Sequence, residues 1–260
     1  FGLGYTFKPL SQSSANPYMF ELKVANAGAK KLTGAKMNIS VNNASGNQVF
    51  YSTSDTSTIN ILDTVTYLSN QNYDPATIGA YEMFFWATSD SVISSDTIQM
   101  QAVITDSVYA RDYNDPEGSW GVARSCGGLQ ILNVFDIYSN EEVSSASAHI
   151  SGNSIIGTPV FAVLYEVDTT QTPWAFIQLA QTDDYVLQQQ DTGNWITIPF
   201  KPSYTVFPGQ YAIAIGGYAH PIDTFGVSFS GTPEIPMSRI QDNGCNLGTQ
   251  PFGYWYYINN

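Results

Sequence analysis

The stretch that decides the fold is Met-Phe-Glu-Leu-Lys-Val-Ala, at residues 19–25. Phe20, Leu22 and Val24 alternate there with one acidic and one basic residue. Because successive side chains of a β-strand point to opposite faces, this pattern places the apolar residues on one face and the charges on the other. The turn-forming sequence Asn-Ala-Gly follows directly. The stretch therefore predicts a half-buried strand that ends in a turn.

Similar short runs recur over the first hundred residues, and helix signals are nearly absent. Turns rich in Gly, Asn, Asp and Pro separate the runs. The expected strands span residues 19–25, 36–41, 48–51, 58–62, 64–68, 79–88 and 97–104. Short strands at this spacing are typical of an immunoglobulin-like β-sandwich, which we expect over residues 1–111.

Residues 112–121 read Asp-Tyr-Asn-Asp-Pro-Glu-Gly-Ser-Trp-Gly, which is rich in acids, Gly and Pro, and indicates an acidic linker. The runs that follow are longer and more apolar. The expected strands span residues 129–137, 143–150, 159–167, 175–180, 185–187, 195–199, 210–216, 225–229 and 252–258. They predict a larger, jelly-roll-like sandwich over residues 122–260. The predicted fold class is therefore all-β, with two tandem antiparallel β-sandwiches.

Composition excludes several classes of protein. The chain has 260 residues and a formal net charge of −13, and only 12% of its residues are charged. An aromatic content of 14% is enough for a packed core and argues against disorder. The excess of acids argues against nucleic acid as a partner, because phosphate contacts need clustered Lys and Arg. No apolar run reaches 18 residues, so we expect no membrane span. The chain starts at Phe1, which indicates a processed or excised chain.

Cys126 and Cys245 are the two cysteines, and neither has the spacing of a metal site. They are either a disulfide that closes the second sandwich or two buried thiols. Gly127 and Gly244 give the neighbouring backbone the freedom that bridge geometry needs. We expect the disulfide, which implies an oxidising compartment.

Catalytic signals are scarce. His149 and His220 are the two histidines, and neither lies in an HExxH zinc motif. The sequence contains neither a nucleophile elbow nor a phosphate-binding loop. Adjacent acids on a strand point to opposite faces, whereas glycoside hydrolysis needs two acids across a cleft. We therefore expect no catalytic residues and no cofactor, with a secreted hydrolase fragment as an alternative.

The linker has a second interpretation, as a structural calcium site. Four oxygen-bearing side chains occur there within six residues: Asp112, Asn114, Asp115 and Glu117. Ca²⁺ takes six to eight oxygen ligands, and acidic loops supply several of them. The spacing differs from that of an EF-hand, and a solvated acidic hinge is the explanation that we favour.

Eight of the fifteen Asp residues are followed directly by Ser or Thr. One explanation is structural, since Asp opens turns and β-branched residues continue strands. The other is a resemblance: five triplets are similar to the three-residue O-glycosylation motif of exported Bacteroidota proteins, in which the middle residue carries the sugar. That resemblance implies the acceptors Thr64, Ser91, Thr97, Ser107 and Thr169.

The sequence TDSVYARDYNDPEGSWG at residues 105–121, with GLQILNVFDI at residues 128–137, extends the resemblance. It looks like the junctions of modular Bacteroidota surface proteins, in which an immunoglobulin-like module precedes a jelly-roll-like one. The resemblance implies export by the type IX secretion system and a secreted or cell-surface location. The family's C-terminal sorting motif is not found in the sequence, so we expect a mature product or a fragment.

The leading hypothesis is a non-catalytic, secreted or cell-surface structural or adhesion protein, for example a subunit of an extracellular assembly. Its expected partners are copies of itself, other surface proteins or glycans. The alternative is a carbohydrate-binding module of a secreted multidomain protein, in which tryptophans stack on sugar rings. The candidates are Trp120, Trp174, Trp195 and Trp255. Trp174 and Trp195 flank polar turns, so we expect them to be more exposed than Trp86.

Overall fold

The structure is a computed structural model and describes residues 4–112, 115–121, 127–218, 225–230, 237–244, 248–250 and 252–258. Strands account for 57% of the residues and helices for 3%, which confirms the predicted all-β class. The chain divides into two compact units, one ending at Arg111 and one beginning at Asp112. Among the described residues, no helix is long and apolar enough to cross a lipid bilayer.

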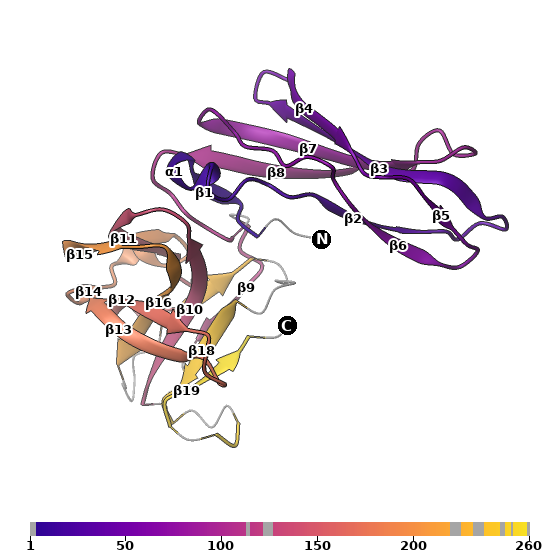
Figure 1. Cartoon of the computed structure of the whole chain (residues 1–260). Helices are drawn as coiled ribbons and strands as arrows, with labels where there is room; N and C mark the ends of the chain where they lie inside the picture. The colour runs from indigo at the N-terminus through magenta and orange to yellow at the C-terminus, as the bar shows by residue number, and fades with distance from the viewer. Residues whose placement is uncertain are drawn as a thin grey trace. The chain divides into compact units, whose positions relative to one another are not determined.

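The first unit consists of strands β1 to β8 and one short helix (Figure 1). Its elements are β1 (Phe7–Pro9), α1 (Leu10–Ser13), β2 (Glu21–Ala25), β3 (Leu32–Asn43), β4 (Gln48–Thr53), β5 (Ser57–Ile59), β6 (Thr64–Leu68), β7 (Gly79–Thr88) and β8 (Ile98–Thr105). The main sheet has the order β1-β8-β7-β3-β4, and β5 pairs with β3. Strands β2 and β6 form a separate antiparallel pair.

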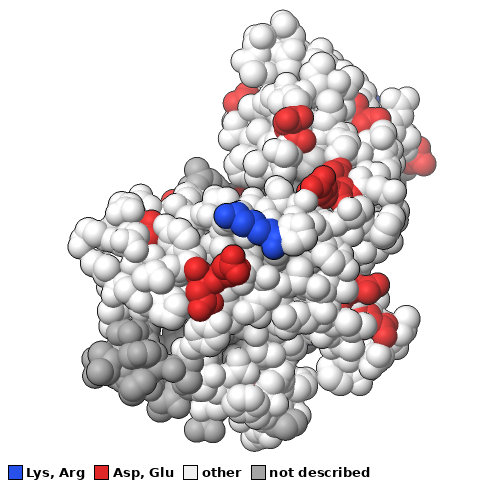
Figure 2. All heavy atoms as spheres, turned by 90° about the vertical axis from the view of Figure 1, so that its left-hand side faces the viewer, with Lys and Arg blue, Asp and Glu red and all other residues white. Residues whose placement is uncertain are grey.

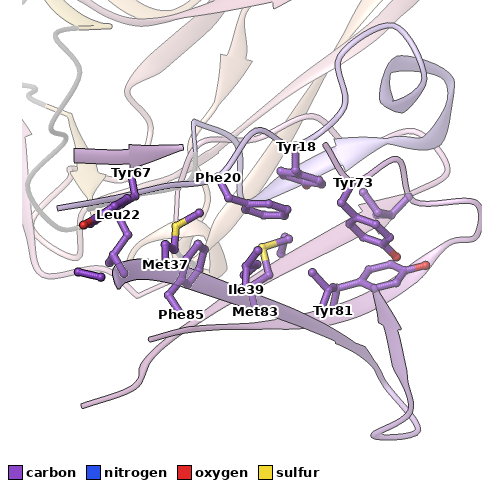
Figure 3. Close-up of a cluster of buried hydrophobic side chains, with 14 of the residues drawn as sticks. Tyr18, Phe20, Leu22, Met37, Ile39, Tyr67, Tyr73, Tyr81, Met83 and Phe85 are labelled. Atoms are coloured by element: carbon purple, nitrogen blue, oxygen red, sulfur yellow. The ribbon is translucent and has the colours of Figure 1, made fainter. Parts of the chain in front are cut away.

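The core of the first unit is built from alternating side chains of both sheets. Tyr81, Met83 and Phe85 of β7 are buried, and the residues between them are only partly buried. Phe20 and Leu22 belong to the same buried cluster, as the alternation in residues 19–25 predicts. Figure 3 shows these side chains pointing toward one another. The rings of Phe20 and Phe85 meet edge to face with centroids 5.7 Å apart. Burial of this apolar surface is the main stabilising contribution.

One charged side chain lies inside the first unit. Lys8 is 2% exposed, and its Nζ donates a hydrogen bond of 2.5 Å to the backbone oxygen of Asn16. The same Nζ lies 3.8 Å from the ring centroid of Tyr18. Burial lowers the pKa of Lys8 to about 8, although the negative charge of Asp74 acts in the opposite direction.

The second unit consists of strands β9 to β19 (Figure 1). Its elements are β9 (Gly118–Gly121), β10 (Gly128–Ile137), β11 (Glu141–His149), β12 (Pro159–Asp168), β13 (Ala175–Gln181), β14 (Tyr185–Val186), the 3-10 helix η1 (Gln189–Asp191), β15 (Trp195–Val206), β16 (Gly209–Tyr218), β17 (Gly226–Phe229), β18 (Ser238–Asp242) and β19 (Tyr254–Tyr257). The large sheet has the order β13-β12-β16-β10-β18-β19, and β14 pairs with β12. Strand β11 pairs with β15, and β9 pairs with β17.

Both faces of the large sheet are covered around β12, which is buried from Val160 to Tyr165. The β11–β15 pair contacts β12 and β16. An aromatic cluster contains Val163 and Tyr165 together with rings from β13 and β19. Phe176 of β13 and Trp255 of β19 have ring centroids 5.2 Å apart, although their strands end the sheet on opposite sides. The sheet is therefore curled enough for its two end strands to meet through their side chains.

The structure differs from the sequence prediction at three places. Residues 118–121, within the expected linker, form strand β9, because they pair with β17 more than a hundred residues later. The expected strand at residues 58–62 ends at Ile59, since Leu62 has a φ of 60° and lies in a turn. Strands β1 and β18 were not predicted, because neither shows apolar alternation.

Candidate functional site

The outer face of the β11–β15 pair carries the most exposed of the four proposed sugar-stacking tryptophans. Trp195 is 44% exposed and lies opposite His149 across the two strands. On the same face, Ser147 lies opposite Thr197, and both are exposed. The alternate residues of both strands are buried, so the strand pair fixes this row of side chains at the surface.

Short contacts organise the row. The rings of His149 and Trp195 meet edge to face, with centroids 5.7 Å apart and an interplanar angle of 84°. The Nδ1 atom of His149 is 2.9 Å from the hydroxyl of Ser228, in a hydrogen bond whose direction depends on the histidine tautomer. The hydroxyls of Ser147 and Thr197 are 2.9 Å apart. An indole beside a set of hydroxyls provides both the stacking surface and the hydrogen-bonding groups that a sugar ring requires.

The other proposed stacking residues are less accessible. Trp174 is partly buried instead of exposed, because the guanidinium of Arg239 lies 4.6 Å from its ring centroid. It also packs against the aromatic cluster of the second unit, as does Trp255. Trp120 is partly buried in β9, opposite Val227. Trp195 is therefore the strongest stacking candidate.

All five proposed glycan acceptors are exposed: Thr64, Ser91, Thr97, Ser107 and Thr169. Thr64 begins β6, and the other four lie in turns or irregular segments next to strand ends. These positions are accessible to a modifying enzyme without unfolding of a strand. Exposure is necessary for glycosylation but does not establish it.

The aspartates of these triplets also have a structural role. The carboxylate of Asp63 accepts a hydrogen bond of 2.8 Å from the backbone N–H of Thr64. Asp168 accepts bonds from the side chain and backbone N–H of Thr170, at 2.6 and 2.9 Å, and from the Gln171 side chain at 2.7 Å. The side-chain bonds of Thr170 and Gln171, with the Thr170 N–H, lower the pKa of Asp168. The turn-forming explanation of the triplets therefore holds alongside the glycosylation hypothesis.

The calcium and disulfide predictions fall largely outside the described residues. Asn114, Cys126, Cys245 and His220 are not among them. Within the described part of the chain, no group of three or more His, Cys, Asp or Glu side chains is arranged to hold a metal ion. Asp112, Asp115 and Glu117 belong to that described part. Both predictions remain untested.

Two features could not be identified from the sequence. The contact between His149 and Ser228 joins strands β11 and β17, and no local pattern indicates it. Arg239 contacts the ring of Tyr257, 18 residues later, and that of Trp174, 65 residues earlier, so its position in the aromatic cluster depends in part on a distant segment. Both features arise from the pairing of strands, which sequence patterns do not specify.

Comparisons with known proteins give little further information. No family model matches the sequence, and neither does any curated protein. One solved structure that resembles the chain comes from work on the "promiscuous specificity of the carbohydrate-binding modules from the beta-sandwich super family". It is 8% identical, covers 83% of this chain and 98% of its own, and has a TM-score of 0.23. A likeness at this level carries no argument about ligand or function.

Proposed function

We propose that this chain is a non-catalytic, secreted or cell-surface structural or adhesion protein that carries O-linked glycans. The observation that supports this most directly is that all five acceptor residues are exposed and lie at or next to the ends of strands. The surface is also poor in charge, and Figure 2 shows isolated acidic groups and few basic ones among uncharged residues. Such surfaces suit close packing with neighbouring proteins or sugars better than long-range attraction of a charged substrate.

The location of the protein and its partners are parts of the same proposal. The resemblance at residues 105–137 supports export by the type IX secretion system. Strand β4 ends the main sheet of the first unit, and its Val49 and Tyr51 are exposed. An open strand edge of this kind is able to pair with another surface protein or with a second copy of the chain.

The test is the intact mass of the protein purified from its native host, before and after reduction. We expect several hexose-scale mass additions, one of which disappears in Thr169→Val. Thr56→Val is the matched control, because Thr56 is exposed and follows an Asp but is not in one of the five triplets. A mass equal to that of the unmodified polypeptide would refute the glycoprotein proposal. The change on reduction reports the disulfide independently.

Carbohydrate binding is a second candidate function, supported by the exposed Trp195 beside His149 and the Ser147–Thr197 hydroxyl pair. A glycan array followed by calorimetry tests it. We expect Trp195→Ala to abolish binding and Trp120→Ala to preserve it. An array without any binding glycan, or equal affinities for wild type and Trp195→Ala, would rule out this surface.

A further inference from the structure

A buried arginine in the second unit lacks hydrogen-bond partners. Arg239 of β18 is 2% exposed, and its Nε and Nη2 atoms have no partner among the described residues. The guanidinium keeps its positive charge at any physiological pH and presents five N–H donors. Proteins rarely bury such donors without an acceptor, because desolvation then goes uncompensated. The two orphaned nitrogens therefore point to an acceptor that is missing from the structure.

Aromatic rings surround this guanidinium. The central carbon lies 3.8 Å from the ring centroid of Tyr257, 4.6 Å from that of Trp174 and 5.6 Å from that of Phe176. Tyr257 belongs to β19, whereas Phe176 belongs to β13 at the other end of the sheet. The faces of these rings attract the positive charge of the guanidinium but do not supply an oxygen acceptor for its N–H bonds.

The identity of the two orphaned atoms narrows the class of ligand. Nε and Nη2 lie on the same side of the guanidinium, and their N–H bonds are parallel. This pair matches the two oxygens of a carboxylate in a bidentate arrangement. The surrounding rings are apolar, so desolvation of a doubly charged sulfate costs more there than desolvation of a singly charged carboxylate.

We infer that Arg239 is a binding site for the carboxylate of a small ligand whose body packs against the surrounding aromatic rings. The inference does not depend on the proposed function, since it uses neither the glycan acceptors nor the Trp195 surface. Two of the rings around Arg239 reach the surface, since Tyr257 is 47% exposed and Trp174 is partly exposed, and binding requires these side chains to move.

The experiment is a titration of the full chain with sodium benzoate, sodium glucuronate, sodium sulfate and glucose at constant ionic strength. Tryptophan fluorescence and the thermal unfolding midpoint are the readouts, since Trp174 and Trp255 lie in the cluster. We expect at least one of the two carboxylates to produce a saturable fluorescence change and a higher midpoint, and sulfate and glucose to produce neither. Binding of glucuronate alone would identify the ligand as a sugar acid, and binding of benzoate would identify a more general carboxylate site.

Variants separate binding from a purely structural role of the arginine. Arg239→Met, which keeps the length of the side chain without the charge, should eliminate the response. Arg239→Lys, which keeps the charge without the two parallel donors, should weaken binding at least tenfold and serves as the deciding variant if the methionine protein does not fold. Arg111→Met in the first unit is the matched control and should bind as wild type does. An absent response in wild type, an equal response to sulfate, or an unchanged response in Arg239→Lys would overturn the inference.

Discussion

Raising the pH from 7 to 9.5 is expected to stabilise the first unit, because it removes the charge of the buried Lys8. Burial lowers the pKa of this amine from 10.5 to about 8. Between these two values the unfolded chain binds more protons than the folded one, so the free energy of unfolding rises with pH. The unfavourable effect of the charge is complete below pH 8 and decreases above it.

The magnitude follows from the two titration curves. One pKa unit corresponds to about 1.4 kcal/mol, and integration between pH 7 and 9.5 gives an increase of about 2 kcal/mol in the free energy of unfolding. Tyr18 and Tyr73 do not interfere, because burial raises the pKa of both hydroxyls and keeps them neutral in this range.

The assay is urea unfolding at pH 7, 8 and 9.5, followed by circular dichroism, for the wild type and two variants. Lys8→Met removes the titrating group and should abolish the pH-dependent increase. Lys31→Met, at an exposed position, should retain it. If the stability of Lys8→Met rises with pH as much as that of wild type, the lysine is not the cause and the reasoning fails.

Four substitutions test side-chain packing and backbone conformation. Ile39→Ala, at a fully buried position, should cost about 2–5 kcal/mol in urea unfolding, and a loss below about 1 kcal/mol would contradict its place in the core. Gly216→Ala should cost about 1–3 kcal/mol because the new methyl group would lie 2.6 Å from the Phe161 ring, whereas Gly152→Ala, with open space around it, should be nearly neutral. Leu62→Asn should raise the free energy of unfolding by about 0.5–1 kcal/mol and the melting temperature with it. Asparagine adopts the left-handed conformation of this position more readily than leucine does.

The sequence predicts this fold best where polar and apolar residues alternate. The prediction for residues 79–88 coincides with β7 at both ends, because the buried residues of that strand alternate with less buried ones. Strand β18 was not predicted, since Ser-Arg-Ile-Gln-Asp contains one aliphatic residue among four polar ones. Its position depends on pairing with β10 and β19, which local sequence does not determine.

For the candidate site residues too, exposure is predictable where it depends on local sequence and unpredictable where it depends on distant segments. Exposure of the five acceptors follows from their positions next to turns, which the Asp residues mark in the sequence. Trp174 also flanks a polar turn, yet Arg239, 65 positions later, lies over its ring. Local composition predicts whether a residue lies in a loop. Contacts with segments that are distant in the sequence determine whether its side chain is exposed.

The strand order of the large sheet has a consequence for how the second unit folds. Strand β10 lies between β16 and β18, so an early segment is completed only by a strand roughly 100 residues later. The first unit has a similar arrangement, because Phe7 of β1 pairs with Val103 of β8. During synthesis, each unit therefore remains incomplete until nearly its last strands have emerged. Pairing at such long sequence separation is slow, which lengthens the time during which unpaired strand edges are exposed.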